Sequence, residues 1–256
     1  MAVTLHNSVV ASVAIAGGNT ASGVTLRLGD VPGRFLVFAC QMRTNTTSLT
    51  SVSWQPAGTP AGQQAMTLLG AYQPGANQIR VEFWGLLAPT AFTSNGARVA
   101  FTSGTAVNAV GWAVCLAGVN QTSPYIGYPA AASSMTSSGG ALTTGNTGTM
   151  NVATVINDML LVADAFDMVT EAETFISGSG QQFLGSTSSP GATTSAKVRG
   201  GVSLKTAAGA TTTCLTTVGS ASASINYALT AIPFTASTDN SPRWVENPVT
   251  AVTVAA

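Results

Sequence analysis

Apolar and polar residues alternate with a period of two along most of this chain, and clusters of Gly, Pro, Asn and Ser separate the alternating stretches. Such alternation places every second side chain on the same face of an extended strand and predicts β-structure. In one stretch, Val81 and Phe83 fall on one face and Trp84 on the other. Residues 109–116 alternate large side chains with small ones, which predicts a bulky face in a core and a small face against a close neighbour. The predicted strands are residues 9–15, 35–42, 50–54, 66–71, 80–87, 99–103, 109–116, 149–154, 159–166, 198–204, 213–218 and 225–232.

The fold class follows from these strands and from the turns between them. No stretch of comparable length repeats its apolar residues at the helical spacing, so almost no helix is expected. Dipeptides such as Pro32-Gly33, Asn95-Gly96 and Pro190-Gly191 supply the backbone angles of tight turns. We therefore predict an all-β protein, an antiparallel two-sheet sandwich of the jelly-roll type. The side chains expected in its core are Phe35, Trp84, Trp112, Val114, Leu161 and Leu229.

Two changes in composition bear on the domain boundaries. Residues 128–146 are rich in Ala, Ser, Gly and Thr, and we interpret them as a long loop, because neither side has enough bulky strands to close an independent sandwich. We therefore expect one sandwich domain over residues 1–234. Beyond it, Pro242 and Pro248 disfavour a helix and restrict the backbone toward extended forms, which predicts an extended C-terminal arm over residues 235–256.

The arm holds the candidate assembly residues of the chain. Trp244 is expected to anchor it in an apolar pocket. The alternating residues near the terminus are expected to form a short strand that adds to an exposed sheet edge of the same or a neighbouring subunit. The candidate assembly residues are Trp244, Val249, Val252 and Val254.

Charge is scarce and balanced in this chain. Charged residues make up 7% of the 256 residues, against about 25% in a typical soluble domain, and the net charge is zero. Without a basic cluster to neutralise phosphates or anionic lipids, we expect neither nucleic acid nor a membrane surface as partner. The longest apolar run, residues 106–119, is shorter than the about 20 residues of a membrane-spanning helix. No basic residue precedes Arg27, so no cleaved secretion signal is expected.

The residue types of common catalytic and metal sites are nearly absent. His6 is the single histidine and lies near one terminus, which disfavours Ser-His-Asp and Cys-His arrangements. Cys40, Cys115 and Cys214 are far apart, and each lies inside an apolar run, which predicts buried free thiols rather than disulfides or zinc ligands. We expect no catalytic residue, no bound metal and no cofactor.

Two groups of side chains leave alternatives open. The acidic residues between 164 and 173 fit a solvated loop best, a calcium site second and a glycosidase pair third. Aromatic side chains can stack on sugars. Strand positions favour the core for Trp84 and Trp112, whereas Tyr125 and Tyr128 are expected in a loop. The acidic group is Asp164, Asp167, Glu171 and Glu173, and the aromatic group is Trp54, Tyr72, Trp84, Trp112, Tyr125 and Tyr128.

Four stretches, residues 80–89, 109–124, 157–164 and 227–232, together resemble a family of β-sandwich modules found in bacterial surface proteins and phage structural proteins. The resemblance covers roughly residues 35–234 and lies in strand packing and turns. It implies a jelly-roll-like fold that serves in building and binding rather than in catalysis. The chain departs from the family pattern at residues 55–63, where it has a Pro- and Gly-containing insertion in place of a tight turn.

The resemblance and the low charge lead to one expected function and two alternatives. We expect a non-enzymatic structural protein of the phage virion, a capsid decoration (cement) component that binds the major capsid protein and neighbouring copies of itself. A surface without ions can pack against other copies without the desolvation cost of several kcal/mol per buried unpaired ion. The first alternative is a carbohydrate-binding or adhesive module of a tail or cell-surface protein. The second alternative is a divergent sandwich glycosidase.

Overall fold

The computed structural model describes residues 2–15, 22–44, 47–74, 79–92, 96–125, 136–142, 147–167, 175–190, 197–218 and 225–237. Every regular element among these residues is a β-strand, and every strand pairing is antiparallel. The predicted all-β, antiparallel sandwich is therefore confirmed. We refer below to residues 2–125 as the first half of the chain and to residues 136–237 as the second half.

The strands fall into two series along the chain. The first half holds β1 (Thr4–Ile15), β2 (Ser22–Thr25), β3 (Phe35–Met42), β4 (Leu49–Gln55), β5 (Gln64–Ala65), β6 (Thr67–Tyr72), β7 (Arg80–Leu87), β8 (Arg98–Ser103) and β9 (Val107–Ala117). The second half holds β10 (Thr136–Leu142), β11 (Thr147–Ala153), β12 (Met159–Asp167), β13 (Phe175–Ser177), β14 (Gln182–Ser188), β15 (Val198–Thr206), β16 (Thr211–Val218) and β17 (Ile225–Phe234).

The expectation of an uninterrupted loop over residues 128–146 is wrong, because β10 lies within it. β10 forms one edge of its sheet and pairs with β17 along its whole length. Its sequence, Thr-Ser-Ser-Gly-Gly-Ala-Leu, lacks the alternation of large and polar side chains that marks a strand. Main-chain hydrogen bonds to a strongly patterned neighbour are enough to hold such a segment extended, and they leave no signature in its own sequence.

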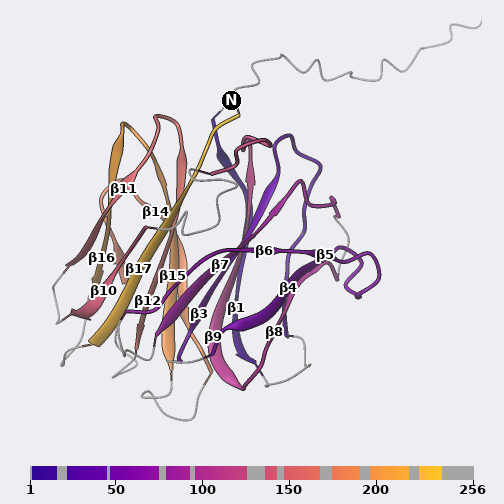
Figure 1. Ribbon diagram of the computed structural model, residues 1–256, viewed down its shortest axis with the longest axis horizontal. Helices are drawn as coiled ribbons and strands as arrows, with labels where there is room; N and C mark the ends of the chain where they lie inside the picture. The colour runs from indigo at the N-terminus through magenta and orange to yellow at the C-terminus, as the bar shows by residue number, and fades with distance from the viewer. Residues whose placement is uncertain are drawn as a thin grey trace, which may run out of the picture.

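The strands form four sheets, and these stack as the layers visible from right to left in Figure 1. The first outer sheet has the order β2-β8-β4-β5, and the first inner sheet has the order β1-β9-β3-β7-β6. The second inner sheet has the order β10-β17-β12-β15-β14, and the second outer sheet has the order β11-β16-β13. Each half therefore forms a two-sheet sandwich of its own, which corrects the expectation that neither half has enough bulky strands to do so.

The two halves follow one plan. If β5 and β6 are counted as one interrupted strand, each inner sheet joins the first, eighth, third, sixth and fifth strand of its half in that order. The register agrees as well, because Phe35 pairs with Leu87 and Leu116 just as Met159 pairs with Thr206 and Phe234. Residues 35–43 are therefore structurally equivalent to residues 159–167.

Three apolar cores hold the four layers together. One lies inside the first sandwich and includes Leu36, Phe38 and Phe101, with the Phe38 and Phe101 rings stacked at 4.7 Å. A second lies inside the second sandwich and includes Leu160 and Phe166. The third, which we call the shared core, lies between the two inner sheets. The first half contributes Phe35, Val37, Phe83, Trp112 and Val114 to the shared core, and the second half contributes Leu161, Val202, Ile232 and Phe234. The expectation of one domain over residues 1–234 stays a prediction.

Glycines allow the two inner sheets to approach closely. A Cβ on Gly200 would lie 2.9 Å from the side chain of Gln41, and one on Gly185 would lie 3.1 Å from the Trp112 ring. The buried Gln41 amide spans the interface and donates a hydrogen bond of 3.2 Å to the carbonyl of Gly201. A larger residue at position 200 would require the Gln41 side chain or Val110 to shift.

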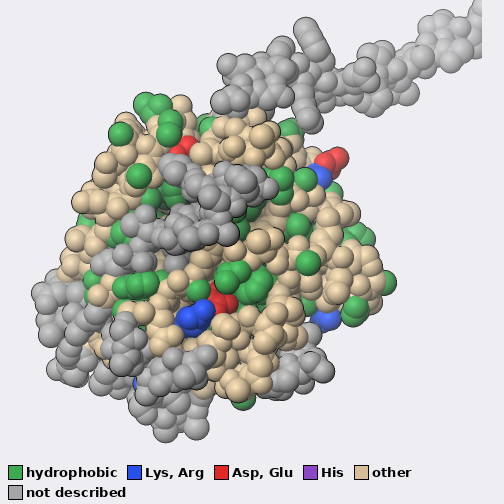
Figure 2. Space-filling view, viewed as in Figure 1, with side chains coloured by type: hydrophobic (Ala, Val, Ile, Leu, Met, Phe, Trp, Pro, Cys, Tyr) green, Lys and Arg blue, Asp and Glu red, His purple; other side chains and the backbone are tan. Residues whose placement is uncertain are grey.

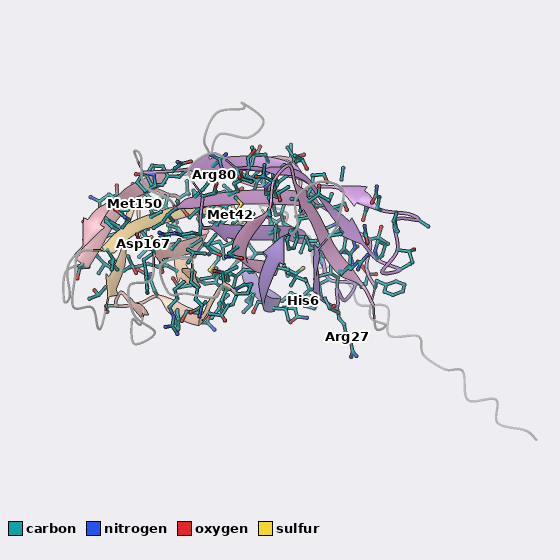
Figure 3. The ribbon with its side chains drawn as sticks, turned by 90° about the horizontal axis from the view of Figure 1, so that it is seen from below. His6, Arg27, Met42, Arg80, Met150 and Asp167 are labelled. Carbon is teal, nitrogen blue, oxygen red and sulfur yellow. The ribbon has the colours of Figure 1, made fainter. Side chains whose placement is uncertain are left out.

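Equivalent residues of the two halves meet at one end of this interface. The Arg43 guanidinium lies 3.2 Å from the Asp167 carboxylate, and these residues follow or end the equivalent strands β3 and β12. Figure 3 views the molecule from below and labels Met42 and Asp167, the last residues of these strands. At the other end, Val119 forms an isolated antiparallel bridge with Ala236 just beyond the equivalent strands β9 and β17. Contacts between like elements are what an approximate twofold relation between the halves requires.

Most of the expected core residues are buried. Phe35, Trp112, Val114, Leu161 and Leu229 are each at most 3% exposed. The small face predicted for residues 109–116 also packs as expected, since Gly111 leaves room for the Phe38 ring. The prediction for Trp84 is confirmed only in part, because its side chain is partly buried and packs at the margin of the first core. Its indole nitrogen instead donates a hydrogen bond to the carboxylate of Glu82.

Replacing Trp112 with Ala tests whether the shared core contributes strongly to stability. Trp112 is 3% exposed and its ring lies against the backbone of the other half. We expect chemical denaturation to show a loss of about 3–5 kcal/mol in the free energy of unfolding, the usual range for a core tryptophan. The surface change Leu68→Ala is the control, since Leu68 is 44% exposed, and it should stay within about 0.5 kcal/mol of the parent. A loss below about 1 kcal/mol for the Trp112 variant would contradict the packing described above.

Candidate functional site

The predicted assembly residues, Trp244, Val249, Val252 and Val254, lie outside the described residues. The described part of the chain ends at Ser237. The site that can be built from the structure is the end of the sandwich from which the arm departs. The first described residue, Ala2, and the last, Ser237, line the same hollow there, and both chain ends lie at the top of Figure 1.

This end is held together by the segments that follow the last strand of each half. The backbone nitrogen of Asn120 donates to the carbonyl of Thr235 at 2.9 Å, and that of Ser237 donates to the carbonyl of Gly118 at 2.8 Å. Tyr125 packs its ring edge-on against both Phe35 and Phe234. The arm consequently starts from a fixed position over the shared core.

A tight loop, residues 154–158, presents two apolar side chains beside this exit. Val155 is 58% exposed and Ile156 is 62% exposed. The Asp158 carboxylate accepts a hydrogen bond of 2.8 Å from the backbone nitrogen of Val155, and the Asp158 backbone nitrogen donates back to the Val155 carbonyl. Burial raises the pKa of Asp158, although backbone hydrogen bonds from Val155 and Ala236 oppose that rise. The loop thus presents two exposed aliphatic side chains on a hydrogen-bonded backbone.

The first half contains the equivalent loop, residues 30–34. Gly33 and Asn157, which occupy equivalent positions, both have left-handed backbone angles, with φ of 63° and 74°. Equivalent hydrogen bonds also tie each loop to its inner sheet, from Ala88 to the Arg34 carbonyl and from Ala207 to the Asp158 carbonyl. A hollow of about 280 Å³ lies beside the first loop, and one of about 500 Å³ lies beside the second.

The four acidic residues considered for calcium binding or glycoside hydrolysis do not come together where they are described. Asp164 points into the core of the second sandwich, whereas Asp167, three residues on, forms the ion pair with Arg43 and accepts hydrogen bonds from Asn226. Glu171 and Glu173 lie outside the described residues. Within the described ranges, no group of three or more His, Cys, Asp or Glu side chains is placed to hold a metal ion.

Asp164 and Glu82 show two ways of burying a carboxyl group. Glu82 is fully buried and accepts hydrogen bonds from Arg80, Trp84 and the backbone of Leu49. Asp164 is 1% exposed, and neither of its oxygens has a hydrogen-bond partner among the described residues. Burial therefore raises the pKa of Asp164 well above its usual range, since the neutral acid is the cheaper form in an apolar core.

The aromatic residues considered for sugar stacking are mostly internal. Trp54 is fully buried and donates from its indole nitrogen to the carbonyl of Thr90, and Trp112 belongs to the shared core. Tyr72 and Tyr125 are partly buried against the shared core. Tyr128 lies outside the described residues. No stacking platform is formed by the described members of this group.

The remaining chemistry-bearing residues have structural surroundings. Cys40, Cys115 and Cys214 are free and buried, as predicted, and burial raises the pKa of Cys115 to about 12 and that of Cys214 to about 11. Such thiols stay protonated and unreactive at neutral pH. His6 lies on the edge strand β1, and its Nε2 accepts a hydrogen bond from the backbone nitrogen of Gly29.

Comparison with known proteins found no counterpart for this chain. No protein-family model, no curated protein and no solved structure matched it. Among the described residues there is also no helix long and apolar enough to cross a membrane.

Replacing Asp164 with Asn should change how stability depends on pH. The folded-state pKa of Asp164 is raised, so the wild type loses stability as pH rises above the unfolded-state value of about 3.9. The loss is up to about 1.4 kcal/mol per pH unit until the folded-state pKa is reached. Asp164→Asn removes this dependence, and denaturation at several pH values should show it gaining on the wild type between pH values of about 4 and 7.

The exposed residue Asp30 supplies the matched control. Asp30 is 89% exposed and pairs with Arg34 only at the surface, so Asp30→Asn should change stability little at any pH tested. A difference between Asp164→Asn and the wild type that stays constant from acid to neutral pH would show that the Asp164 carboxyl is not buried as described.

Proposed function

We propose that this chain is a non-enzymatic structural protein of a phage virion, which binds a capsid surface and neighbouring copies of itself. The resemblance in residues 80–89, 109–124, 157–164 and 227–232 supports this class of protein, and so does the scarcity of charge. The described residues offer no competing arrangement for catalysis, because the acidic side chains diverge and the thiols are buried.

The observation that carries the proposal is the scarcity of charge on the outer faces of both outer sheets, where hydroxyl and amide side chains predominate. Arg98 on β8 is a charged exception on the first of these faces. On the first outer sheet, the hydroxyls of Thr50 and Ser51 lie 2.9 Å and 2.7 Å from that of Thr102. On the second, Thr147 pairs with Thr217 at 2.8 Å, and Thr213 donates to Asn151 at 2.7 Å. The face of the molecule shown in Figure 2 likewise has charged side chains at only a few points.

Such faces suit a protein that is covered by others. Covering an ion costs several kcal/mol unless the partner supplies a matched charge, whereas a hydroxyl that is already hydrogen-bonded loses far less. Faces with so few charges thus allow close packing against many identical copies with few specific charge partners. A protein that assembles in many copies on a particle surface needs to pack closely in this way.

The strand order supports a finer assignment of each half as a jelly roll. With β5 and β6 counted as one interrupted strand, each half has eight strands in two packed sheets. The first and last strands of each half are neighbours, and its first four strands alternate between the inner and outer sheet. Eight strands arranged in this way are typical of jelly rolls, which are common in capsid proteins and in lectins. Fold alone does not decide between those uses.

The proposal is tested by adding the purified chain to capsids of the phage or prophage whose genome encodes it, after the chain has been stripped from them. We expect the full chain to bind in many copies and to sediment with the particles. A chain that lacks residues 243–256 should keep the circular dichroism of the full chain, because the described sandwiches end before that segment. It should bind the capsids and self-associate more weakly, since it lacks the strand that adds to a neighbouring edge.

Two results would speak against this function. If the full chain does not bind the capsids, the assembly role is wrong. Binding to immobilised glycans in its place would favour the carbohydrate-binding alternative. If the truncated chain binds as tightly as the full one, the arm has no part in attachment.

A further inference from the structure

The hollow beside the loop at residues 154–158 has the size and the apolar lining of a binding site for a large side chain. Its volume is about 500 Å³, and its walls include Val155, Ile156 and Ala236. Val155 and Ile156 are among the few large apolar side chains of the described residues that are strongly exposed. Hydrogen bonds between Val155 and Asp158 hold the backbone of this loop, so that binding of an apolar group costs little entropy for ordering the loop.

The first half shows what happens at the equivalent place. There the segment after β9 crosses its own loop, with hydrogen bonds of 3.0 Å from Gly118 to the Pro32 carbonyl and from Val119 to the Gly33 carbonyl. Val119 becomes fully buried, and Val31 is partly buried.

The second half differs at this point. Ser237, the residue equivalent to Val119, donates instead to the carbonyl of Gly118 in the other half. Thr235 is likewise held by the first half, through the carbonyl of Pro124. The segment after β17 therefore touches its own loop through the Ala236 backbone, which hydrogen-bonds the Asp158 carboxylate, and does not cross the loop as its counterpart does. Val155 and Ile156 remain 58% and 62% exposed.

The chain itself supplies a fitting group close by. Ser237 lines the hollow, and Trp244 follows seven residues later, within an extended reach of about 25 Å. Between them stands Asp239-Asn240-Ser241-Pro242, a sequence of residue types that favour turns. A turn in this segment would reverse the chain direction and bring Trp244 close to Thr235 and Ser237.

We propose that Trp244 of the same chain docks in this hollow against Val155 and Ile156. The tether keeps its effective concentration in the millimolar range, which favours the same chain over a second copy. The inference rests on the proposed function, in which the arm attaches the subunit to its neighbours, and it adds the place where the arm is anchored. Residues 249–254 stay free to reach a neighbouring subunit. The test uses free protein without capsids, so that it can fail or succeed independently of capsid binding.

The test places the photoreactive amino acid p-benzoylphenylalanine at position 244 of the full chain. The variant is illuminated as an equal mixture of isotopically heavy and light protein, and cross-linked peptides are identified by mass spectrometry. We expect the main product to join position 244 to the peptide that holds residues 155–158, with both peptides light or both heavy. Pairing within one isotope identifies docking within one chain.

Substitutions in the loop provide the matched comparison. Ile156→Asp should lower the yield of this cross-link about tenfold, because it removes the apolar contact of an exposed side chain. Leu68→Asp is the control, since Leu68 is 44% exposed on β6 and the change should leave the yield unaltered. Should Ile156→Asp not fold, Ile156→Ser makes the same test with a neutral side chain.

Two outcomes would overturn the inference. Mixed heavy and light pairs would show that the hollow receives the arm of a second copy. Cross-links to other parts of the chain, or a yield indifferent to Ile156→Asp, would show that Trp244 does not dock there.

Discussion

Burial of apolar side chains between the two inner sheets is the interaction on which the rest of this structure depends. It makes the central strands β3, β9, β12 and β17 two-sided, because each faces a sandwich core on one side and the shared core on the other. A strand buried on both faces has few positions for charged residues. The scarcity of charge in the sequence is therefore in part a consequence of stacking four layers.

The same interaction dictates where small and polar residues must stand. Gly185 and Gly200 let the sheets approach, and the Gln41 amide donates a hydrogen bond to the Gly201 carbonyl within the buried interface. The approximate twofold relation of the halves then brings like elements together at both ends of the shared core. At one end this produces the Arg43–Asp167 ion pair, and at the other it joins the two exit segments from which the arm departs. The candidate site is thus a product of how the halves pack.

Much of the fold could be predicted from the sequence, because period-two alternation marks strands with one bulky face. Residues 35–42 and 80–87 agree with β3 and β7 to the residue. Strands made of small or few residues, such as β10 and β5, carry no such pattern and were missed. The structural equivalence of the two halves was missed as well, because equivalent positions are similar in size and polarity but are mostly different residues. Arg80 and Arg199 match, but Cys40 faces one core where Asp164 faces the other.

The candidate site was harder to predict than the fold. The exposed pair Val155 and Ile156 reads in the sequence like any short apolar run, and only the surrounding hydrogen bonds distinguish a presented pair from a buried one. The equivalence of residues 30–34 and 154–158 gives the signal in retrospect. Each precedes the central strand of its half, and each has a residue suited to left-handed backbone angles, Gly33 or Asn157.

Native-state hydrogen exchange, resolved by residue, tests most directly whether the shared core joins the two sandwiches into one cooperative unit. The amides of β3 and β12, one from each half, are the ones to compare. We expect them to exchange through openings of equal free energy with equal dependence on denaturant, because unfolding either half exposes the shared core of both. A much lower free energy of opening for one strand than for the other would show that the sandwiches unfold independently, and would contradict this account.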